Sequence, residues 1–198
     1  MTAESWGDGP SPWRPLLDAA LAAAAEDPTA RFVQLATVGP SGRPANRTVG
    51  FRGFLAQTDS LTFTTDGRSR KAAHLARQPW AAVCWYVAAT RQQFRFQGPA
   101  QVVGPAHPAL GAERAAAWEA LSDRTRRLFL GPPPGEPLAA PEAFETDPAA
   151  LGQPPPAFCL LVLEPRRVEV LDVRTAPHQR ALYERQADGG WDSLAVNP

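Results

Sequence analysis

The feature that most constrains this chain is the recurrence of short strand-like segments with only brief helical stretches between them. Residues 31–38 and 44–54 alternate in polarity on either side of the turn Gly39-Pro40-Ser41-Gly42, which predicts a β-hairpin. Further strands are expected at residues 60–65, 80–88, 92–103, 158–164, 167–173, 179–186 and 191–196. Strands at such spacing predict a mainly β (α+β) fold built as an antiparallel barrel, with a two-sheet sandwich as the alternative.

Helices are expected at residues 12–26, 68–77 and 107–130. Ser11 is the expected cap of the first helix, and Pro12 suits its first turn. Gly98 interrupts a regular strand pattern and indicates a bulge or a bend. Residues 131–157 are rich in proline and are interpreted as a surface connection, because the strand pattern resumes after them. We therefore expect a single domain over residues 1–198.

Charge and composition argue against several classes of protein. Twenty basic side chains balance twenty acidic ones, so neither a nucleic-acid-binding protein nor a polybasic membrane-surface module is expected. No run approaches the roughly 18 apolar residues of a membrane span, and residues 1–10 lack the basic and apolar regions of a signal peptide. Cys84 and Cys159 lie in apolar strand patterns and are expected to be buried thiols. A cytoplasmic protein is therefore expected.

The common catalytic and metal-binding motifs do not fit this sequence. A dinucleotide-binding loop follows a strand, and no strand precedes Gly7-Asp8-Gly9. Ser41 lacks the spacing of a nucleophile elbow. His74, His107 and His178 have no second ligand at metal-binding spacing. We therefore expect no metal site and assign no catalytic residue.

Basic and hydroxyl side chains gather between residues 46 and 97. They include Arg47, Arg52, Thr62, Thr64, Thr65, Ser69, Arg70 and Lys71. The turn 66–71 (DGRSRK) enters a short helix, and the start of a helix favours an anion. Lys71 is the one lysine beside nineteen arginines, and its compact ammonium complements an arginine fork on a phosphate. The region predicts a pocket for a phosphate monoester, with a solvated basic turn as the alternative.

Three segments of this region resemble the pyridoxamine 5'-phosphate oxidase superfamily: RTVGFR (47–52), LTFTTDGRSRK (61–71) and RQQFRFQG (91–98). The C-terminal segment 168–198 resembles a short FMN-binding branch of that family that is common in bacteria. The resemblance implies an antiparallel Greek-key split β-barrel with a few peripheral helices. It also implies a homodimer with FMN at its interface, and a small-molecule substrate.

The resemblance also implies roles for individual residues. Arg47 and Lys71 would bind the phosphate of FMN, and Gln93 would approach the flavin ring from the other subunit. The full set of implied cofactor-binding residues is Arg47, Thr48, Val49, Gly50, Thr64, Thr65, Ser69, Arg70, Lys71, Gln93 and Arg180.

The implied substrate site departs from the family pattern. Arg52 stands where the family has a lysine, and Ala176-Pro177-His178 stands where it has Arg-Leu-His. Arg52 and His178 are the remaining candidate substrate contacts. The resemblance implies an FMN-dependent oxidoreductase that could oxidise pyridoxamine or pyridoxine 5'-phosphate. One alternative is an FMN-binding reductase, carrier or sensor without that oxidase activity, and another is a barrel that uses haem or a deazaflavin.

Overall fold

The structure is a computed structural model and describes residues 11–198. The expectations for Gly7-Asp8-Gly9 and for a signal peptide lie outside the described residues. The strands are β1 (Phe32–Val38), β2 (Pro44–Phe54), β3 (Leu61–Asp66), β4 (Trp80–Val87), β5 (Gln92–Val103), β6 (Phe158–Leu163), β7 (Arg167–Asp172), β8 (Gln179–Arg185) and β9 (Trp191–Val196). The helices are α1 (Arg14–Ala23), α2 (Arg70–Arg77), α3 (Gly111–Glu119) and α4 (Asp123–Arg127), with short 3-10 helices η1 (Pro28–Arg31), η2 (Ala88–Thr90), η3 (Pro141–Phe144) and η4 (Pro148–Gly152).

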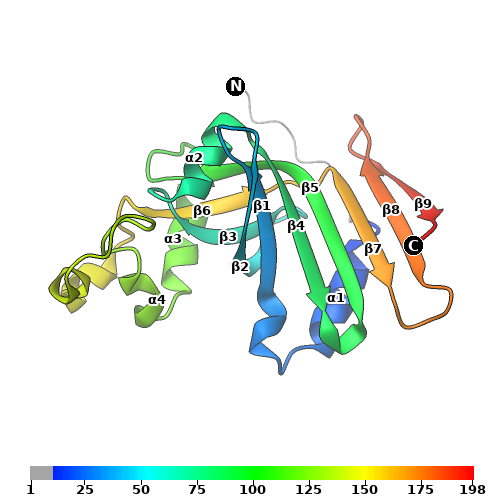
Figure 1. Cartoon of the computed structure of the whole chain (residues 1–198), viewed down its shortest axis with the longest axis horizontal. Helices are drawn as coiled ribbons and strands as arrows, with labels where there is room; N and C mark the ends of the chain where they lie inside the picture. Colours follow the sequence, from blue (N-terminus) through cyan, green and yellow to red (C-terminus); the bar gives the residue numbers. More distant parts are fainter. Residues whose placement is uncertain (1–10) are drawn as a thin grey trace.

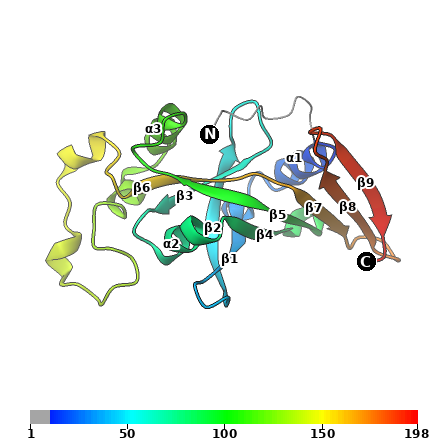
Figure 2. The same cartoon turned by 90° about the horizontal axis from the view of Figure 1, so that it is seen from above.

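Six antiparallel strands close into a barrel (Figure 1). Their order is β4-β1-β2-β3-β6-β5, and β5 pairs back onto β4 to complete the ring. Strands β7, β8 and β9 extend the sheet outward from β5. Figure 2 shows α3 and the long connection after α4 at one end of the molecule, and β8 and β9 at the other. The predicted barrel is confirmed over the sandwich.

Strand β5 completes the barrel by changing partners along its length. Residues 92–97 pair with β7, residues 100–103 pair with β6, and the whole run from 92 to 99 pairs with β4. Gly98 lies at the change of partner, where a Cβ atom would approach the carbonyl oxygen of Glu164 to 1.9 Å. The register with β4 is continuous through this point, so the glycine marks the passage between two partners rather than a bulge.

Alternation along β1 separates the core from the outer face of the sheet. Val33, Leu35 and Thr37 point into the barrel and are buried, whereas Phe32 and Gln34 point outward and are exposed. Strands β4 and β5 have a similar two-sided pattern, because successive side chains of a strand point to opposite faces, whereas β6 is buried on both faces. The core and the outer face therefore carry separate sets of side chains.

The start of α1 differs from the prediction. Trp13 is the residue before the helix, and it makes no side-chain cap bond. The hydroxyl of Ser11 instead donates to the carboxylate of Asp59 at 2.5 Å, and the Ser11 amide donates to the same oxygen at 2.9 Å. Arg14 adds a 2.8 Å bond to Asp59. The predicted Ser11 cap was wrong, because the loop before β3 supplies a stronger, charged acceptor.

The predicted helix over residues 107–130 was also wrong, because it is divided into α3 and α4. Ser122 starts the second helix, and its hydroxyl accepts a hydrogen bond from the amide of Thr125. This is the ordinary way in which serine starts a new helix. The division turns the chain toward the proline-rich residues 131–157, within which η3 and η4 form.

Arg114 of α3 fastens the end of this proline-rich segment. Arg114 is buried, with 6% of the residue exposed. Its Nε donates to the carbonyl of Phe158 at 2.8 Å. Its Nη2 donates to the carbonyl of Pro155 at 2.7 Å. A guanidinium with several donors in one plane suits this clustered set of carbonyl acceptors.

Replacing Arg114 with alanine is expected to lower the free energy of unfolding by about 2 kcal/mol or more, since the buried carbonyl of Phe158 and the half-buried carbonyl of Pro155 lose a charged donor. Urea denaturation measures this change. Arg124→Ala is the matched control, because Arg124 is exposed on α4. Equal stability of the two variants would contradict a fastening role for Arg114.

None of the helices within residues 11–198 has the length and apolar character that crossing a membrane requires.

Candidate functional site

The hairpin of β1 and β2 places Arg47 on the inner face of the barrel. Arg47 is paired with Leu35, whose side chain is in the core, so both point the same way. The Nη1 of Arg47 donates to the carbonyl of Leu35 at 3.1 Å and to the hydroxyl of Thr37 at 2.9 Å. These two bonds hold the half-buried guanidinium beside the end of β1.

The turn after β3 brings a second cation to the same place. The carboxylate of Asp66 accepts bonds from the amide of Arg68 at 2.7 Å and from its Nη2 at 2.7 Å. The buried hydroxyl of Ser69 donates to the Asp66 carbonyl at 2.6 Å and accepts a bond from the Nζ of Lys71 at 3.3 Å. Thr65 lies 3.5 Å from Ser69, oxygen to oxygen. The polar groups of the turn therefore bond to one another, and the ammonium of Lys71 lies within hydrogen-bond distance of Ser69.

The two cations are held close together. Burial lowers the pKa of Lys71 and the charge of Arg47 lowers it further, while the charge of Asp66 opposes both effects. Burial also lowers the pKa of Arg47. Within residues 11–198 no carboxylate is hydrogen-bonded or ion-paired to either cation, and Asp66 is engaged by Arg68. The two negative charges of a phosphate monoester fit this donor set.

Two further residues of this cluster were not predicted from the sequence. Thr37 is buried between Arg47 and His74, whose Nδ1 lies 3.1 Å from the threonine hydroxyl. Because Arg47 can only donate, the hydroxyl accepts from Arg47 and its own proton is left for the imidazole. A threonine on the apolar face of a predicted strand was the one signal available for this role.

A second group of predicted residues lies on the outer face of the sheet. Thr48 accepts a 2.9 Å bond from Gln34, whereas Val49 packs against the core. Gly50 lies beside Arg52, because a Cβ atom at Gly50 would be 3.8 Å from its guanidinium. Arg52 is exposed.

Gln93 and Arg180 lie on the same outer face at a distance along the sheet. Gln93 is paired with Leu171, and Leu171 is paired with Arg180. Thr48 is on β2 and Arg180 is on β8, five strands away in the sheet order. At ordinary strand spacing this is about 24 Å along the sheet. One flavin ring therefore cannot contact both Thr48 and Arg180 within one protomer.

Arg180 is bound to the buried carboxylate of Glu169, a residue that was not predicted from the sequence. Its Nε donates to Glu169 at 3.1 Å, and its Nη2 makes a second, shorter bond to the same oxygen. Burial alone would raise the pKa of Glu169, but the bond from Arg180 and the charges of Arg95, Arg180 and Arg167 outweigh it. The pKa of Glu169 therefore lies below its ordinary value.

This lowered pKa predicts how stability responds to acid. The contribution of ionised Glu169 is complete above the unfolded-state pKa of about 4.3 and is lost as the pH falls through the lower folded-state pKa. Wild type and Glu169→Gln are therefore expected to differ in unfolding free energy by a constant amount above about pH 6 and to converge below about pH 4. Urea denaturation across this range measures the difference. A gap that widens on acidification would contradict the prediction.

The remaining predicted residues lie at the edges of the two groups. Thr64 is half-buried on β3, and Arg70 is exposed at the first turn of α2. The Nδ1 of His178 donates to the carbonyl of Thr175 at 2.8 Å in the exposed loop before β8. The proline-rich segment approaches the turn 66–71, since Arg68 donates to the carbonyl of Gly131 at 3.1 Å.

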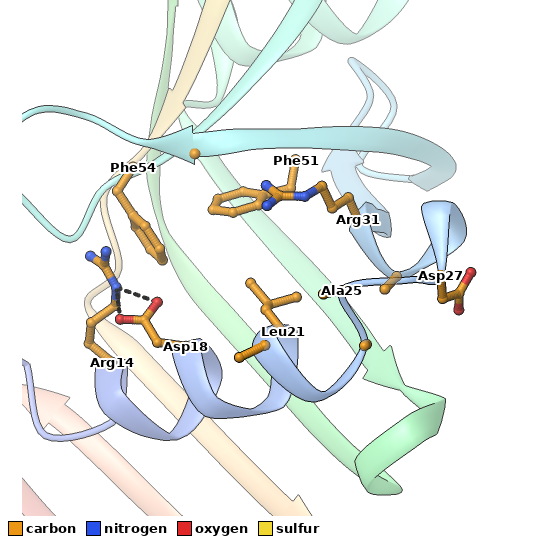
Figure 3. A pocket seen from close by; sticks show the side chains of 12 residues that line it. Arg14, Asp18, Leu21, Ala25, Asp27, Arg31, Phe51 and Phe54 are labelled. Atoms are coloured by element: carbon orange, nitrogen blue, oxygen red, sulfur yellow. Dashed lines mark hydrogen bonds and ion pairs between the residues drawn. The ribbon is translucent and has the colours of Figure 1, made fainter.

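A cavity of about 450 Å³ lies elsewhere, between α1 and β2 (Figure 3). Phe51 and Phe54 line it from β2, Leu21 lines it from α1, and Arg14 is paired with Asp18 at its rim. The predicted site residues do not line this cavity. Within residues 11–198 no group of three or more metal-ligating side chains is present.

Both predicted thiols are free in the structure. Cys159 is buried as expected, whereas Cys84 is half-buried on the outer face of β4. Cys84 therefore differs from the prediction, because alternation on β4 places Val83 and Trp85 in the core instead.

A closed six-stranded antiparallel barrel with an extended sheet is the split-barrel class of fold. The family model described as "Pyridoxamine 5'-phosphate oxidase, FMN-binding domain" matches residues 10–104. Pyridoxine/pyridoxamine 5'-phosphate oxidase 2 of Arabidopsis thaliana is 38% identical, over 95% of this chain and 98% of its own length.

Two solved structures are similar over almost their whole length. A pyridoxamine 5'-phosphate oxidase-related, FMN-binding protein from Nostoc punctiforme has a TM-score of 0.92 and 44% identity, covering 96% of this chain and 100% of its own. PhzG from Burkholderia lata, in complex with tetrahydrophenazine-1-carboxylic acid, has a TM-score of 0.80 and 25% identity, covering 100% and 98%. The chain therefore belongs to the pyridoxamine 5'-phosphate oxidase family, and the resemblance of its motifs is confirmed.

Proposed function

We propose that this protein binds FMN and acts as an FMN-dependent oxidoreductase. The observation that carries the proposal is the pair of cations, Arg47 and Lys71, held together with no bonded carboxylate among the described residues. A phosphate monoester between them would relieve their mutual repulsion and accept their remaining N–H donors. Membership of the family supports FMN as the molecule that brings this phosphate.

The chain's own residues would bind and orient the cofactor. Ser69 and Thr65 would add hydroxyls beside the phosphate, with Thr64 and Arg70 at the edge of that group. The backbone of Thr48, Val49 and Gly50 would run along the flavin ring. When bound, FMN would supply the redox chemistry by accepting electrons and a proton from the substrate.

A homodimer would complete this site. Arg180 lies too far along the sheet from Thr48 to meet the same ring within one protomer, so we infer that a second copy brings Arg180, together with Gln93, to that ring. Phe32 and Tyr86, on the same outer face, are 56% and 51% exposed. Large exposed apolar side chains on one face are typical of a protein–protein interface. We place the dimer contact on this face.

The substrate side of the site is less complete. Arg52 is exposed beside Gly50 and is available to a substrate, whereas His178 is engaged by Thr175 and has Ala176 and Pro177 before it. Pyridoxamine or pyridoxine 5'-phosphate is the first substrate to test, because relatives carry that name. The family's arginine is absent at Ala176, which favours a second candidate, an FMN-binding reductase or carrier without that oxidase activity.

The two free thiols are consistent with a cytoplasmic protein.

The test begins with the colour of the purified protein. We expect a flavin absorption spectrum, release of FMN on denaturation, and a dimer by light scattering. Peroxide formation with pyridoxamine 5'-phosphate under air would support the oxidase, and reduction by a nicotinamide donor alone would support the second candidate. The assay should include a reduced heteroaromatic carboxylic acid, since PhzG is in complex with one. Failure to bind added FMN, or a haem spectrum instead, would overturn the proposal.

A further inference from the structure

One buried carboxylate lies on the outer face of the extended sheet among three arginines. Glu169 of β7 is 5% exposed, although a glutamate on an outer sheet face is normally solvated. Arg180 of β8 makes two bonds to its Oε2, Arg95 of β5 lies 3.4 Å from the same oxygen, and Arg167 lies 3.4 Å from Oε1. Side chains from three strands therefore converge on one acid.

The three arginines are not equivalent. Arg167 has a second acidic partner, Glu184, at 2.9 Å. Arg95 approaches Glu169 at the limit of hydrogen-bond distance. Arg180 makes the closest contacts, and within residues 11–198 Glu169 is its one side-chain partner. The position of the Arg180 guanidinium therefore depends chiefly on Glu169.

Stability alone is a poor reason for this arrangement. Removing a carboxylate from water costs several kcal/mol, and well-packed apolar side chains in place of a buried ion pair are often as stable or more so. The neighbouring outward positions on β7 and β8 carry Leu171 and Leu182, so an apolar filling of the face was available. A charged group kept at such a cost is better explained by orientation of the group that it binds.

We propose that Glu169 is a positioning residue, which holds the Arg180 guanidinium against the sheet in the orientation that contacts FMN. The inference rests on the proposed function, because Arg180 lies on the same face and next to the same Leu171 as Gln93, the other implied ring contact. Glu169 itself need not touch the cofactor. Its carboxylate fixes one end of the guanidinium and leaves its outer edge free for a ligand.

The test uses FMN titration of apoprotein, followed by quenching of flavin fluorescence, with circular dichroism to establish that each variant is folded. We expect Glu169→Gln to raise the dissociation constant of FMN about threefold to tenfold. Glu169→Asp keeps the charge and should recover part of the loss. The double variant Glu169→Gln with Arg180→Ala should bind FMN as Arg180→Ala alone does, because Glu169 acts through Arg180.

Glu184→Gln is the matched control, since Glu184 pairs with Arg167 on the same sheet and should leave FMN affinity unchanged. An unchanged affinity in Glu169→Gln, with or without loss of thermal stability, would overturn the inference. Multiplied losses in the double variant would do the same. A wild-type protein that fails to bind FMN would instead mark failure of the proposed function, which the titration of wild type shows separately.

Discussion

Alanine in place of Arg47 is expected to weaken FMN binding by about 1 to 3 kcal/mol, or roughly fivefold to 150-fold in the dissociation constant. The side chain is one of the two cations that would share the phosphate, and its loss removes a charge-assisted contact. Lys71→Met is expected to have an effect of the same size. Fluorescence titration of apoprotein with FMN measures both.

Arg43→Ala provides the control for this experiment. Arg43 is an exposed arginine in the turn between β1 and β2. Its replacement by alanine removes the same charge from the same hairpin. Its variant should bind FMN as wild type does. Thermal unfolding of the apoprotein separates loss of the ligand from loss of the fold, since Arg47 also bonds Leu35 and Thr37. Wild-type affinity in both Arg47→Ala and Lys71→Met would refute the phosphate site.

Gly98→Ala is expected to destabilise the fold by about 3 kcal/mol or more. The added Cβ would lie 1.9 Å from the carbonyl oxygen of Glu164 and 3.1 Å from the amide of Arg166. Those backbone groups are themselves fixed, because Glu164 donates to Pro99 and Arg166 donates to Gln97, each at 2.9 Å. A close-packed interior cannot absorb such an overlap without separating the strands.

Soluble yield and thermal unfolding measure this effect. Gly111→Ala is the control, because a Cβ there has no neighbour within 4 Å and the residue begins a helix. That variant should differ from wild type by no more than about 0.5 kcal/mol. A Gly98→Ala protein as stable as Gly111→Ala would show that the turn between β6 and β7 can move away.

The strands were predictable because their signal is local. The strands predicted over 44–54, 92–103 and 191–196 have the bounds of β2, β5 and β9, and the others agree within one residue at each end, since alternation and turn residues lie in the segment itself. The helix ends were less predictable. Ser11 has the composition of a cap but bonds Asp59, a residue 48 positions away that no local pattern indicates. Ser122 does follow the local cap pattern, and the prediction passed over it.

The site was predictable to the same extent. The turn 66–71 brings Ser69 and Lys71 together through bonds within six residues, so this part of the site could be predicted from the sequence. Thr37 and Glu169 could not be found in this way. Each is a polar residue in an apolar strand, and its closest partners come from other elements: Arg47 and His74 for Thr37, and Arg180 for Glu169. Whether the predicted residues bind FMN remains a prediction.

The double pairing of β5 also bears on how the molecule opens. Its amides and carbonyls are engaged along both edges for most of its length, by β4 on one side and by β7 and then β6 on the other. Local opening at one edge does not expose such a strand, so its amide protons should exchange with deuterium only on global unfolding. Solvent exchange would then report global unfolding at β5, while β9, paired along one edge, exchanges early.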